Sequence, residues 1–400
     1  MTSAVAADHG RQWTLAALIA GLAMVSPFSI DTFFPSFRAI SAEFHLTDWQ
    51  IQQTITVYML PYAVMALVHG PISDAIGRRP VVIVGIFLYA LSSAVCAFAP
   101  SFTVLLVCRA VQGMTAGAGL VVGRAVIRDL HEGPQAQRLM ATITMIFGIA
   151  PAIAPVIGGW IHVALGWRSV FGFMVLLGLA LMLASWVRLP ETHPHSRRVP
   201  FDLRRLAATS WRILSDRHFQ LLALASGINF ATMLVLVGAA PAIVLDHWHL
   251  KETQFAYLFV PLIIGFTLGA GASGRLAGRV APARQVEAGF AFLLAGTGLL
   301  LALHVSMPRP PLLLQHFAIV LLATGVQLVF PVLTLRILDL FPHHRGSVSS
   351  AQSFVSLVFS SLVMGMVVPM LSHSFALLAA GAFTLALLAF GCWRLAARRG

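Results

Sequence analysis

The residues of this chain that could do chemistry are the few charged side chains inside its long apolar stretches. Asp31 lies about 19 residues into the first stretch, between Pro27 and Pro35. An ionised aspartate in the middle of a bilayer costs about 2.5–3.5 kcal/mol on insertion scales, so such a residue normally faces a cavity or a partner. We interpret Asp31 as a proton carrier. A position at the outer membrane interface is the alternative.

A second group of charges occupies the turn GPISDAIGRRP between two apolar stretches. Its small and charged members are Gly70, Asp74, Gly77, Arg78 and Arg79. The glycines allow a tight turn and close helix contact. The aspartate can meet a helix N-terminus or an arginine, and the arginines can bind carboxylates or phosphate groups. We predict a gating contact with Arg128 as the partner of Asp74; arginines that only fix membrane orientation are the alternative.

Composition places these residues in a membrane protein. Of 400 residues, 58% are hydrophobic and 10% are charged, whereas an ordinary soluble domain is about a quarter charged. A helix needs about 20 apolar residues to cross the hydrocarbon. This length predicts an all-α integral membrane protein with twelve spans, near residues 13–34, 49–69, 79–99, 102–123, 138–162, 167–187, 218–244, 255–274, 285–305, 312–335, 347–371 and 375–395.

The distribution of basic residues predicts the orientation of these spans. The formal net charge is +12, and 20 basic residues fall on the inner side if the N-terminus is cytoplasmic. Only Arg38, Arg168, Lys251 and Arg309 fall on the outer side. Because cytoplasmic loops carry the excess of basic residues, we expect both termini in the cytoplasm. The charge therefore indicates topology, and we expect no nucleic-acid partner.

A polar, arginine-rich segment divides the spans into two sets of six. We predict an N-terminal half at residues 1–188, a cytoplasmic linker at 189–217 and a C-terminal half at 218–400. Gly70, Gly77 and Arg78 recur at an offset of 201 in GASGRLAGR, after the eighth span. This echo indicates duplicated halves, which transporters with a site between repeats often have.

The turn GPISDAIGRRP resembles the signature loop of the major facilitator superfamily. RAVQG at 109–113, APAIAPVIGG at 150–159 and LPET at 189–192 match that family in register. IDTFFPSF at 30–37, QQTITVY at 52–58 and GRAVIRDL at 123–130 are similar to its bicyclomycin and chloramphenicol resistance branch, Bcr/CflA, of drug:proton antiporters. The resemblance implies two six-helix halves, alternating access and a bacterial inner membrane.

The resemblance also implies roles for single residues. Arg109 would be the functional arginine of the fourth span, beside the proton site; a structural salt bridge or snorkelling to the cytoplasmic surface is the alternative. The turn at residues 70–80 would stabilise the outward-facing state. Ala23 stands where some phenicol exporters carry a second acid. Phenicols are therefore a less safe substrate prediction than bicyclomycin-like compounds.

The fifth span resembles the antiporter motif of exporters. The matching residues are Pro151, Pro155, Gly158 and Gly159. Alanines stand at 150 and 154, where the motif prefers glycine. Proline removes a backbone hydrogen bond and can kink a helix, and glycine permits close packing. Ordinary prolines of a membrane helix are the alternative reading.

Sparse polar residues in the spans are candidates for a substrate cavity. They are Gln52, Thr54, Tyr58, Asn229 and Gln327. A few polar groups in an apolar, aromatic and methionine-containing chamber suit amphiphilic drugs.

Rival functions lack comparable signals. The sequence has no HExxH, GxSxG or P-loop motif, which disfavours an enzyme or a self-contained ATP-driven pump. His247 and His249 in DHWHL could bind a metal, but two histidines in one outer loop are weak evidence for a metal site. We interpret Cys96, Cys108 and Cys392, which lie in predicted spans, as packing residues.

We therefore expect a monomeric carrier in the lipid bilayer that needs neither cofactor nor metal and is driven by protons. It would export bicyclomycin-like, phenicol or other amphiphilic small molecules in exchange for protons. A proton-coupled nutrient or metabolite transporter on the same fold is the main alternative. A receptor or scaffold is a further alternative, but that function would give Asp31 no role.

Overall fold

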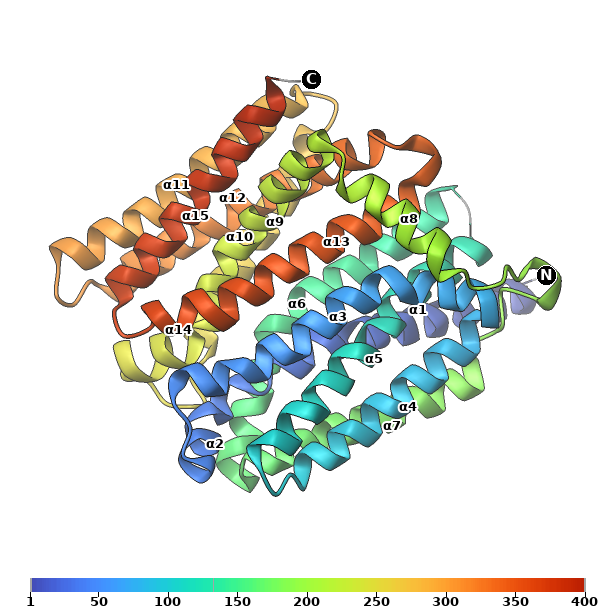
Figure 1. Ribbon diagram of the computed structural model, residues 1–400, viewed down its shortest axis with the longest axis horizontal. Coiled ribbons are helices and arrows are strands. Elements are labelled where there is room, and N and C mark those ends of the chain that lie inside the picture. The colour runs from blue at the N-terminus through green and yellow to red at the C-terminus, as the bar shows by residue number, and fades with distance from the viewer. Residues whose placement is uncertain (1, 132, 399–400) are drawn as a thin grey trace. The chain divides into compact units, whose positions relative to one another are not determined.

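The computed structural model of the chain describes residues 2–131 and 133–398; the side chains of residues 2–13, 133–138, 141–142, 144–149, 152 and 343 lie outside that description. Helices make up all regular structure in the described part of the chain (Figure 1). A helix satisfies its backbone hydrogen bonds internally, as an apolar environment demands. The prediction of an all-α membrane protein is confirmed.

The helices occupy most of the chain. The first series is α1 (Thr2–Asp31), α2 (Phe37–Phe44), α3 (Asp48–Ile76), α4 (Arg78–Ala97), α5 (Phe102–Leu130), α6 (Gly133–Leu165) and α7 (Trp167–Arg188). The second series is α8 (Leu203–Leu214), α9 (Arg217–Gly238), α10 (Ala256–Leu276), α11 (Pro282–Ser306), α12 (Leu312–Asp339), α13 (Arg345–Leu362), α14 (Val368–Leu371) and α15 (Phe375–Ala397). Short 3-10 helices are η1 (Phe34–Ser36), η2 (His195–Arg197) and η4 (Pro342–His344), and π-helical segments are η3 (Ala242–His247) and η5 (Val363–Val367).

All twelve predicted spans coincide with helices, the eleventh with the series α13, η5 and α14. Eleven segments of the described chain are long and apolar enough to cross a membrane. The remaining prediction, near 138–162, falls on α6, whose described apolar part is Ile153–Leu165. The linker predicted at 189–217 contains a helix, α8, which the sequence analysis did not anticipate.

The first span is longer than predicted. The sequence analysis ended it near residue 34, but the apolar helical segment continues through η1 and α2, giving a candidate span of Thr14–Phe44. Asp31 is the last residue of α1 and falls in the middle part of this 31-residue segment. The segment is longer than the roughly 20 residues that cross the hydrocarbon, so the alternative that puts Asp31 at the membrane interface stays open.

Local sequence explains several helix starts. Ser101 caps α5 by accepting a hydrogen bond from the Val104 N–H, and Asp216 caps α9 by accepting one from the Phe219 N–H. Such caps satisfy donors that have no partner inside the helix. Between α3 and α4 the chain turns at Gly77, where φ is 107°, a conformation that glycine adopts at the lowest cost.

The chain forms two compact units. The first contains the residues up to Ser36 together with Leu60–Leu203, and the second contains Phe37–Met59 together with the residues from Arg204 onward. The boundary inside α3 falls beside Pro61, where the helix loses a hydrogen-bond donor. The division into residues 1–188, 189–217 and 218–400 stays a prediction.

Within each unit the long helices lie side by side (Figure 1). In the first unit α4 packs along α5 and α7, and α1 packs along α5 and α6. In the second unit α12 packs on α10 and α11, while α9 packs on α13 and α15. These pairings place the end of α1 against α5 and α6, which carry Arg109 and the antiporter-like motif.

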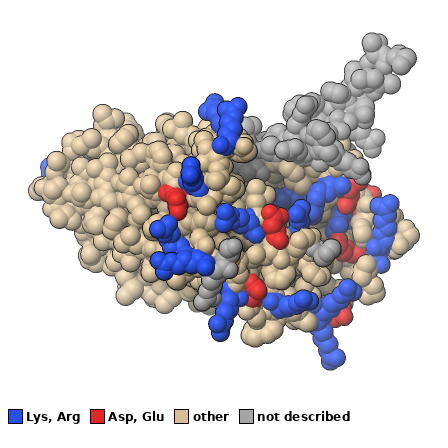
Figure 2. All heavy atoms as spheres, turned by 90° about the horizontal axis from the view of Figure 1, so that it is seen from above, with Lys and Arg blue, Asp and Glu red and all other residues tan. Residues whose placement is uncertain are grey.

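Charged side chains are unevenly spread over the surface. In Figure 2 the left-hand part of the visible face is almost entirely free of charge, whereas basic and acidic side chains mix over the rest. Large apolar side chains such as Phe98, Trp160 and Leu176 are more than 60% exposed. Exposed apolar area of this extent suits contact with lipid tails rather than water.

Close packing joins α6 to the end of α1. A Cβ on Gly158 would overlap the backbone carbonyl of Thr32, the residue after Asp31. Further along this interface, Phe28 is buried together with Ala150 and Ala154. The two alanines therefore provide the small surface for which the antiporter motif uses glycine, and Gly158 fixes how near α6 comes to the α1 terminus.

Replacing Gly158 by alanine should therefore destabilise the protein. We expect Gly158→Ala to reduce the free energy of unfolding by about 1–3 kcal/mol, because the added methyl group meets backbone that cannot move aside easily. Thermal unfolding of the purified protein in detergent measures the change. Gly172→Ala is the matched control, since a Cβ there meets nothing within 4 Å. Equal stability of Gly158→Ala and wild type would contradict the close contact.

Candidate functional site

Arg78 is the centre of an ionic cluster at the turn between α3 and α4. Its Nη1 lies 2.5 Å from Asp74 Oδ1 and donates to Ser73 Oγ at 2.5 Å, and its Nε lies 3.3 Å from Asp129 Oδ2 at the end of α5. The Arg78 side chain is 9% exposed, whereas that of Asp74 is 47% exposed. The planar guanidinium can serve two carboxylates at once because its donors point along different edges.

Glu191 binds the first turn of α4. Its Oε1 accepts a hydrogen bond from the Arg78 N–H at 3.0 Å, and its Oε2 accepts one from the Arg79 N–H at 3.3 Å. The residue before α4 is Gly77, which has no side chain to cap the helix. A Cβ on Gly77 would overlap the Glu191 carboxylate. Glu191 thus supplies both the missing acceptors and a negative charge at the positive end of α4.

The segment after α7 is tied to this turn at further points. Thr192 Oγ1 donates to Asp129 Oδ2 at 2.8 Å, and the Val199 N–H donates to the Asp74 carbonyl at 3.3 Å. Arg79 Nη2 donates to the Trp186 carbonyl at 2.6 Å. The cluster therefore joins the α3–α4 turn, the end of α5 and the start of the linker within the first unit.

Two predictions about this turn are corrected. Asp74 pairs with Arg78, and the α5 residue that enters the cluster is Asp129 rather than Arg128, which is exposed. Neighbouring residues of a helix point about 100° apart, so only one of the two can face the turn. A Cβ on Gly70 would meet nothing within 4 Å, so the close helix contact predicted there is absent.

Arg109 is fully buried and is held by polar groups of the first unit. Its Nη1 donates to the Ser29 carbonyl at 3.0 Å and to Gln112 Oε1 at 2.8 Å. The Ser29 carbonyl belongs to the last turn of α1, where carbonyls have no partner within the helix. The guanidinium also lies 5.2 Å from the centre of the Phe33 ring. Arg109 thus anchors the place where α1 ends.

The same network extends into α4. The Ser29 hydroxyl donates to the Val25 carbonyl at 2.8 Å, so the Tyr89 hydroxyl, 2.5 Å away, donates to Ser29 Oγ. Gln112 Nε2 donates to Ser93 Oγ at 2.7 Å, and that hydroxyl donates to the Tyr89 carbonyl. Polar side chains of α4 and α5 therefore surround the α1 terminus with hydrogen bonds in an otherwise apolar interior.

Asp31 follows Ser29, a member of this network, by two residues. It is 4% exposed, and no ion pair of the described residues includes its carboxylate. Arg109 binds the backbone carbonyl of Ser29, two residues before Asp31. The structure thus places Asp31 and Arg109 at the same helix end without pairing them.

The antiporter-like residues lie on the α6 side of this helix end. Pro151 and Pro155 stand inside α6, and Pro155, Gly158 and Gly159 are buried. Of these, Gly158 packs against the backbone that follows Asp31. The motif therefore shapes the space next to the buried carboxylate.

The first part of α3 belongs to the second unit, where two glutamines bind helix ends. Gln52 Nε2 donates to the Gly238 carbonyl at the end of α9 at 3.0 Å. Gln53 Nε2 donates to the Gly365 carbonyl in η5 at 3.1 Å. Carbonyls at a helix end and in a π-helical segment lack regular partners, so these amides satisfy them.

The other predicted cavity residues are spread along the second unit. Asn229 Nδ2 donates to the Val326 carbonyl at 3.1 Å, beside Gln327 on α12. Asn229 and Gly238 are about 13 Å apart along α9 at 1.5 Å per residue, so Gln52 does not join them. The amide oxygens of Gln52, Asn229 and Gln327 are buried without a hydrogen-bond partner among the described residues. Thr54 and Tyr58 are fully buried.

The sequence analysis missed several functional candidates. Asp129 and Glu191 complete the ionic cluster, and Ser29 and Tyr89 complete the buried network. A signal was available for the first two, because both are carboxylates that follow predicted spans on the arginine-rich side. Among the described residues no group of three or more His, Cys, Asp or Glu side chains is placed to hold a metal ion.

Removing the charge of Glu191 should loosen the start of α4. We expect Glu191→Gln to speed hydrogen exchange in peptides covering residues 78–82 by about fivefold, since the lost cap costs about 1 kcal/mol. Exchange followed by mass spectrometry measures this. Glu287→Gln is the control: its carboxylate forms an exposed pair with Arg394 in the other unit. Unchanged exchange at 78–82 in Glu191→Gln would refute the capping role.

Comparison with known proteins places this architecture in a family. The Major Facilitator Superfamily profile matches residues 19–365. The "Uncharacterized MFS-type transporter YdgK" of Bacillus subtilis (strain 168) is 29% identical over 355 residues, 88% of each chain. The "Bicyclomycin resistance protein homolog" of Haemophilus influenzae is 29% identical over 259 residues, 65% of each chain.

Solved structures agree on the fold. The crystal structure of the human organic anion transporter MFSD10 (TETRAN) matches with a TM-score of 0.72 at 17% identity, covering 96% of this chain and 99% of that chain. At this identity the match shows likeness of fold alone. Because the family profile covers most of the sequence and the structure has the same fold, the chain belongs to the Major Facilitator Superfamily.

Proposed function

We propose that this membrane transporter is a proton-coupled exporter of small amphiphilic drug-like molecules, working by alternating access. We place it in a bacterial inner membrane, with both termini in the cytoplasm, as the distribution of basic residues favours. The observation that carries the proposal is Asp31, an acid that is buried within an apolar segment at the end of a helix.

Asp31 has the surroundings that a proton carrier needs. Its carboxylate is buried and has no ion pair among the described residues, so protonation would remove the cost of keeping a charge in an apolar interior. It also stands where α1 stops, and helix ends change conformation at lower cost than helix interiors. Gain or loss of the proton can thereby be linked to the position of the segment that follows.

Arg109 and Gly158 act on the same helix end. Arg109 fixes the Ser29 carbonyl from the α5 side, and Gly158 fixes the Thr32 backbone from the α6 side. Asp31 lies between these two anchored residues in the sequence. A movement of the backbone at Asp31 that follows a change in its charge would therefore shift α5 and α6 as well.

The ionic cluster at Arg78 is suited to a gate. Asp74 is half exposed, so its pair with Arg78 can exchange with water at small cost, whereas Glu191 and Asp129 tie the turn to its own unit. We assign to this cluster the stabilisation of one of the two access states.

Polar and aromatic groups of the second unit support the choice of substrate class. The unpartnered oxygens of Asn229 and Gln327 can accept hydrogen bonds from N–H or O–H groups of a ligand. Phe230 and Phe330, with ring centres 5.7 Å apart, add an aromatic surface on the same two helices. Compounds with several donors and an apolar body match this chemistry, and the name of the Haemophilus relative makes bicyclomycin the first compound to test.

Removing the Asp31 carboxylate should abolish proton exchange. In liposomes with an imposed proton gradient, we expect bicyclomycin or another substrate to evoke proton movement in wild type and less than a tenth of it in Asp31→Asn. Substrate binding to Asp31→Asn should persist, because the amide keeps the shape of the side chain. A pH-sensitive dye inside the vesicles measures the flux.

Asp48→Asn is the matched control, since Asp48 is an exposed carboxylate at the start of α3. Full proton movement in Asp31→Asn would overturn the coupling role. If the substrate instead moves in the same direction as the protons, the protein is an importer, and the nutrient or metabolite transporter of the same fold becomes the better assignment.

Gln327 provides a test of the substrate assignment. We expect Gln327→Met to weaken binding of a donor-bearing substrate about tenfold, because the substitution removes an acceptor while keeping a similar volume. Isothermal titration in detergent measures the affinity, and thermal unfolding checks the fold. Gln220→Met on the exposed start of α9 is the control. Unchanged affinity in Gln327→Met would remove this residue from the cavity.

A further inference from the structure

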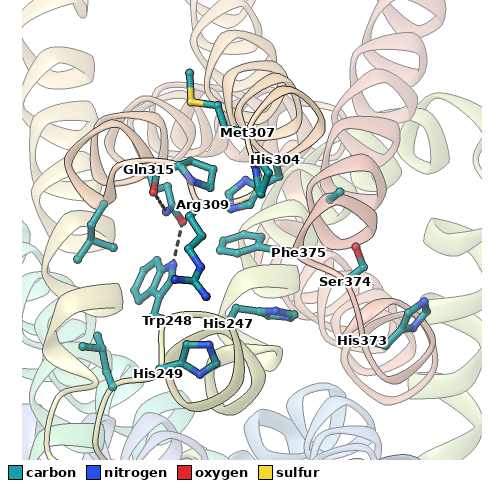
Figure 3. Close-up of a pocket in the computed structure, with 15 residues that line it drawn as sticks. His247, Trp248, His249, His304, Met307, Arg309, Gln315, His373, Ser374 and Phe375 are labelled. Atoms are coloured by element: carbon teal, nitrogen blue, oxygen red, sulfur yellow. Dashed lines mark hydrogen bonds between the residues drawn. The ribbon is translucent and has the colours of Figure 1, made fainter.

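A cavity of about 570 Å³ opens at one end of the second unit (Figure 3). Three connections line it: residues 247–250 after η3, residues 307–312 before α12, and residues 373–376 at the start of α15. Its size is that of an ordinary small-molecule site. None of the cavity residues proposed above for the drug belongs to it.

The residues that line the cavity include basic ones but no acidic one. Its basic residues are His247, His249, His304, Arg309 and His373. The adjacent Asp246 forms an ion pair with Arg38 and is not part of the lining. No ion pair of the described residues includes Arg309, whose guanidinium reaches between Trp248 and His247 in Figure 3. The one permanent charge in the cavity is thus positive and available.

Hydrogen bonds fix the orientation of two of the histidine rings. His247 Nε2 lies 2.9 Å from the Ser372 carbonyl, and His304 Nδ1 lies 2.9 Å from the Leu300 carbonyl. A carbonyl can only accept, so each of these nitrogens carries the proton. The His304 ring also stacks on Phe375, with ring centres 3.9 Å apart. The imidazoles of His249 and His373, which are exposed, keep an N–H that can turn to a ligand.

Aromatic rings form the apolar part of the wall. Trp248 Nε1 donates to Gln315 Oε1 at 2.8 Å, and Gln315 Nε2 donates to the Pro310 carbonyl at 2.9 Å (Figure 3). The Trp248 ring lies 6.3 Å from that of Phe375. These contacts fix both rings in place before any ligand arrives, so binding need not order them.

The start of α15 adds positive potential. Ser374 precedes the helix without capping it, and Ser374, Phe375 and Ala376 all line the cavity. The first N–H groups of a helix have no partner within it, and the helix dipole is positive at this end. Together with Arg309, this helix start gives the cavity two features that favour an anion.

We propose that this cavity binds a small aromatic anion, a carboxylate or sulfonate attached to a planar ring. Arg309 and the start of α15 bind the charged group, and Trp248 and Phe375 pack against the ring. The inference does not depend on proton coupling or on drug export. Under the orientation proposed above, the cavity faces the outside of the cell.

A metal site is the rival interpretation of these histidines. The sequence analysis considered His247 and His249 as ligands, but within the described chain no three His, Cys, Asp or Glu side chains are placed to share a metal ion. The hydrogen bond from His247 Nε2 to Ser372 also occupies one of its ring nitrogens. An organic anion uses the arginine and the aromatic walls, which a metal would leave without a role.

The test measures binding of 1-naphthoate to the purified full-length protein in neutral detergent by isothermal titration. We expect wild type to bind 1-naphthoate at least tenfold more tightly than uncharged 1-naphthamide. Arg309→Gln should weaken naphthoate binding at least tenfold, because a charge-assisted pair is lost from a partly enclosed site. His373→Gln should weaken it about threefold.

Lys251→Gln is the matched control. Lys251 is an exposed cation on the connection that carries His249, but it does not line the cavity. Thermal unfolding verifies that each variant is folded. Equal naphthoate affinity in wild type and Arg309→Gln overturns the proposal, as does equal binding of naphthoate and naphthamide. Tight binding of zinc that His373→Gln abolishes, with no naphthoate binding at 10 mM, would establish the metal site instead.

Discussion

A charged side chain buried among apolar helices needs hydrogen-bond partners from the protein itself. In the first unit this requirement is set by Arg109. The guanidinium is fully buried and cannot lose its proton, so neighbouring protein groups must supply hydrogen-bond acceptors. One acceptor is the Ser29 carbonyl, which is available only because α1 ends two residues later. The helix break at Asp31 and the burial of Arg109 therefore depend on each other. The same break leaves Asp31 at a helix end, where its charge can be coupled to movement.

The ionic cluster at Arg78 obeys the same rule under weaker constraint. There Asp74 borders on water although Arg78 is buried, so their ion pair contributes little by itself and is partly screened by salt. The stability of the cluster comes instead from the number of its contacts, because Asp129 connects α5, and Glu191 connects the linker, to the α3–α4 turn. A contact of this kind holds one arrangement and can still be opened. The buried network fixes the interior of the unit, and under the gating proposal the cluster at Arg78 is the part that changes.

The sequence was sufficient for features that depend on length and composition. Apolar runs located the long helices, eleven of which are long and apolar enough in the described chain to cross a membrane, and the sequence also showed an acid, Asp31, inside an apolar run. Features that depend on tertiary contact were not accessible. Asp129 and Arg128 are adjacent, and only packing decides which of them faces Arg78. The continuation of the first span to Phe44 was missed because Pro35 reads as a stop, whereas here it lies in a single 3-10 turn between two helices. The unpartnered amides of Asn229 and Gln327 required the whole second unit.

The two ligand sites proposed for the second unit differ in chemistry, and one helix, α12, contributes to both. Near the middle of α12, Gln327 offers an acceptor, which suits donor-bearing or cationic molecules; at its first turn, Gln315 supports Trp248 in a cavity that suits anions. The two kinds of ligand would not compete for one place. An anion at the start of α12 can nevertheless affect a substrate beside Gln327, because a helix is a rigid element and both residues move with it. The anion cavity would then modulate transport through α12 without being on the path of the substrate.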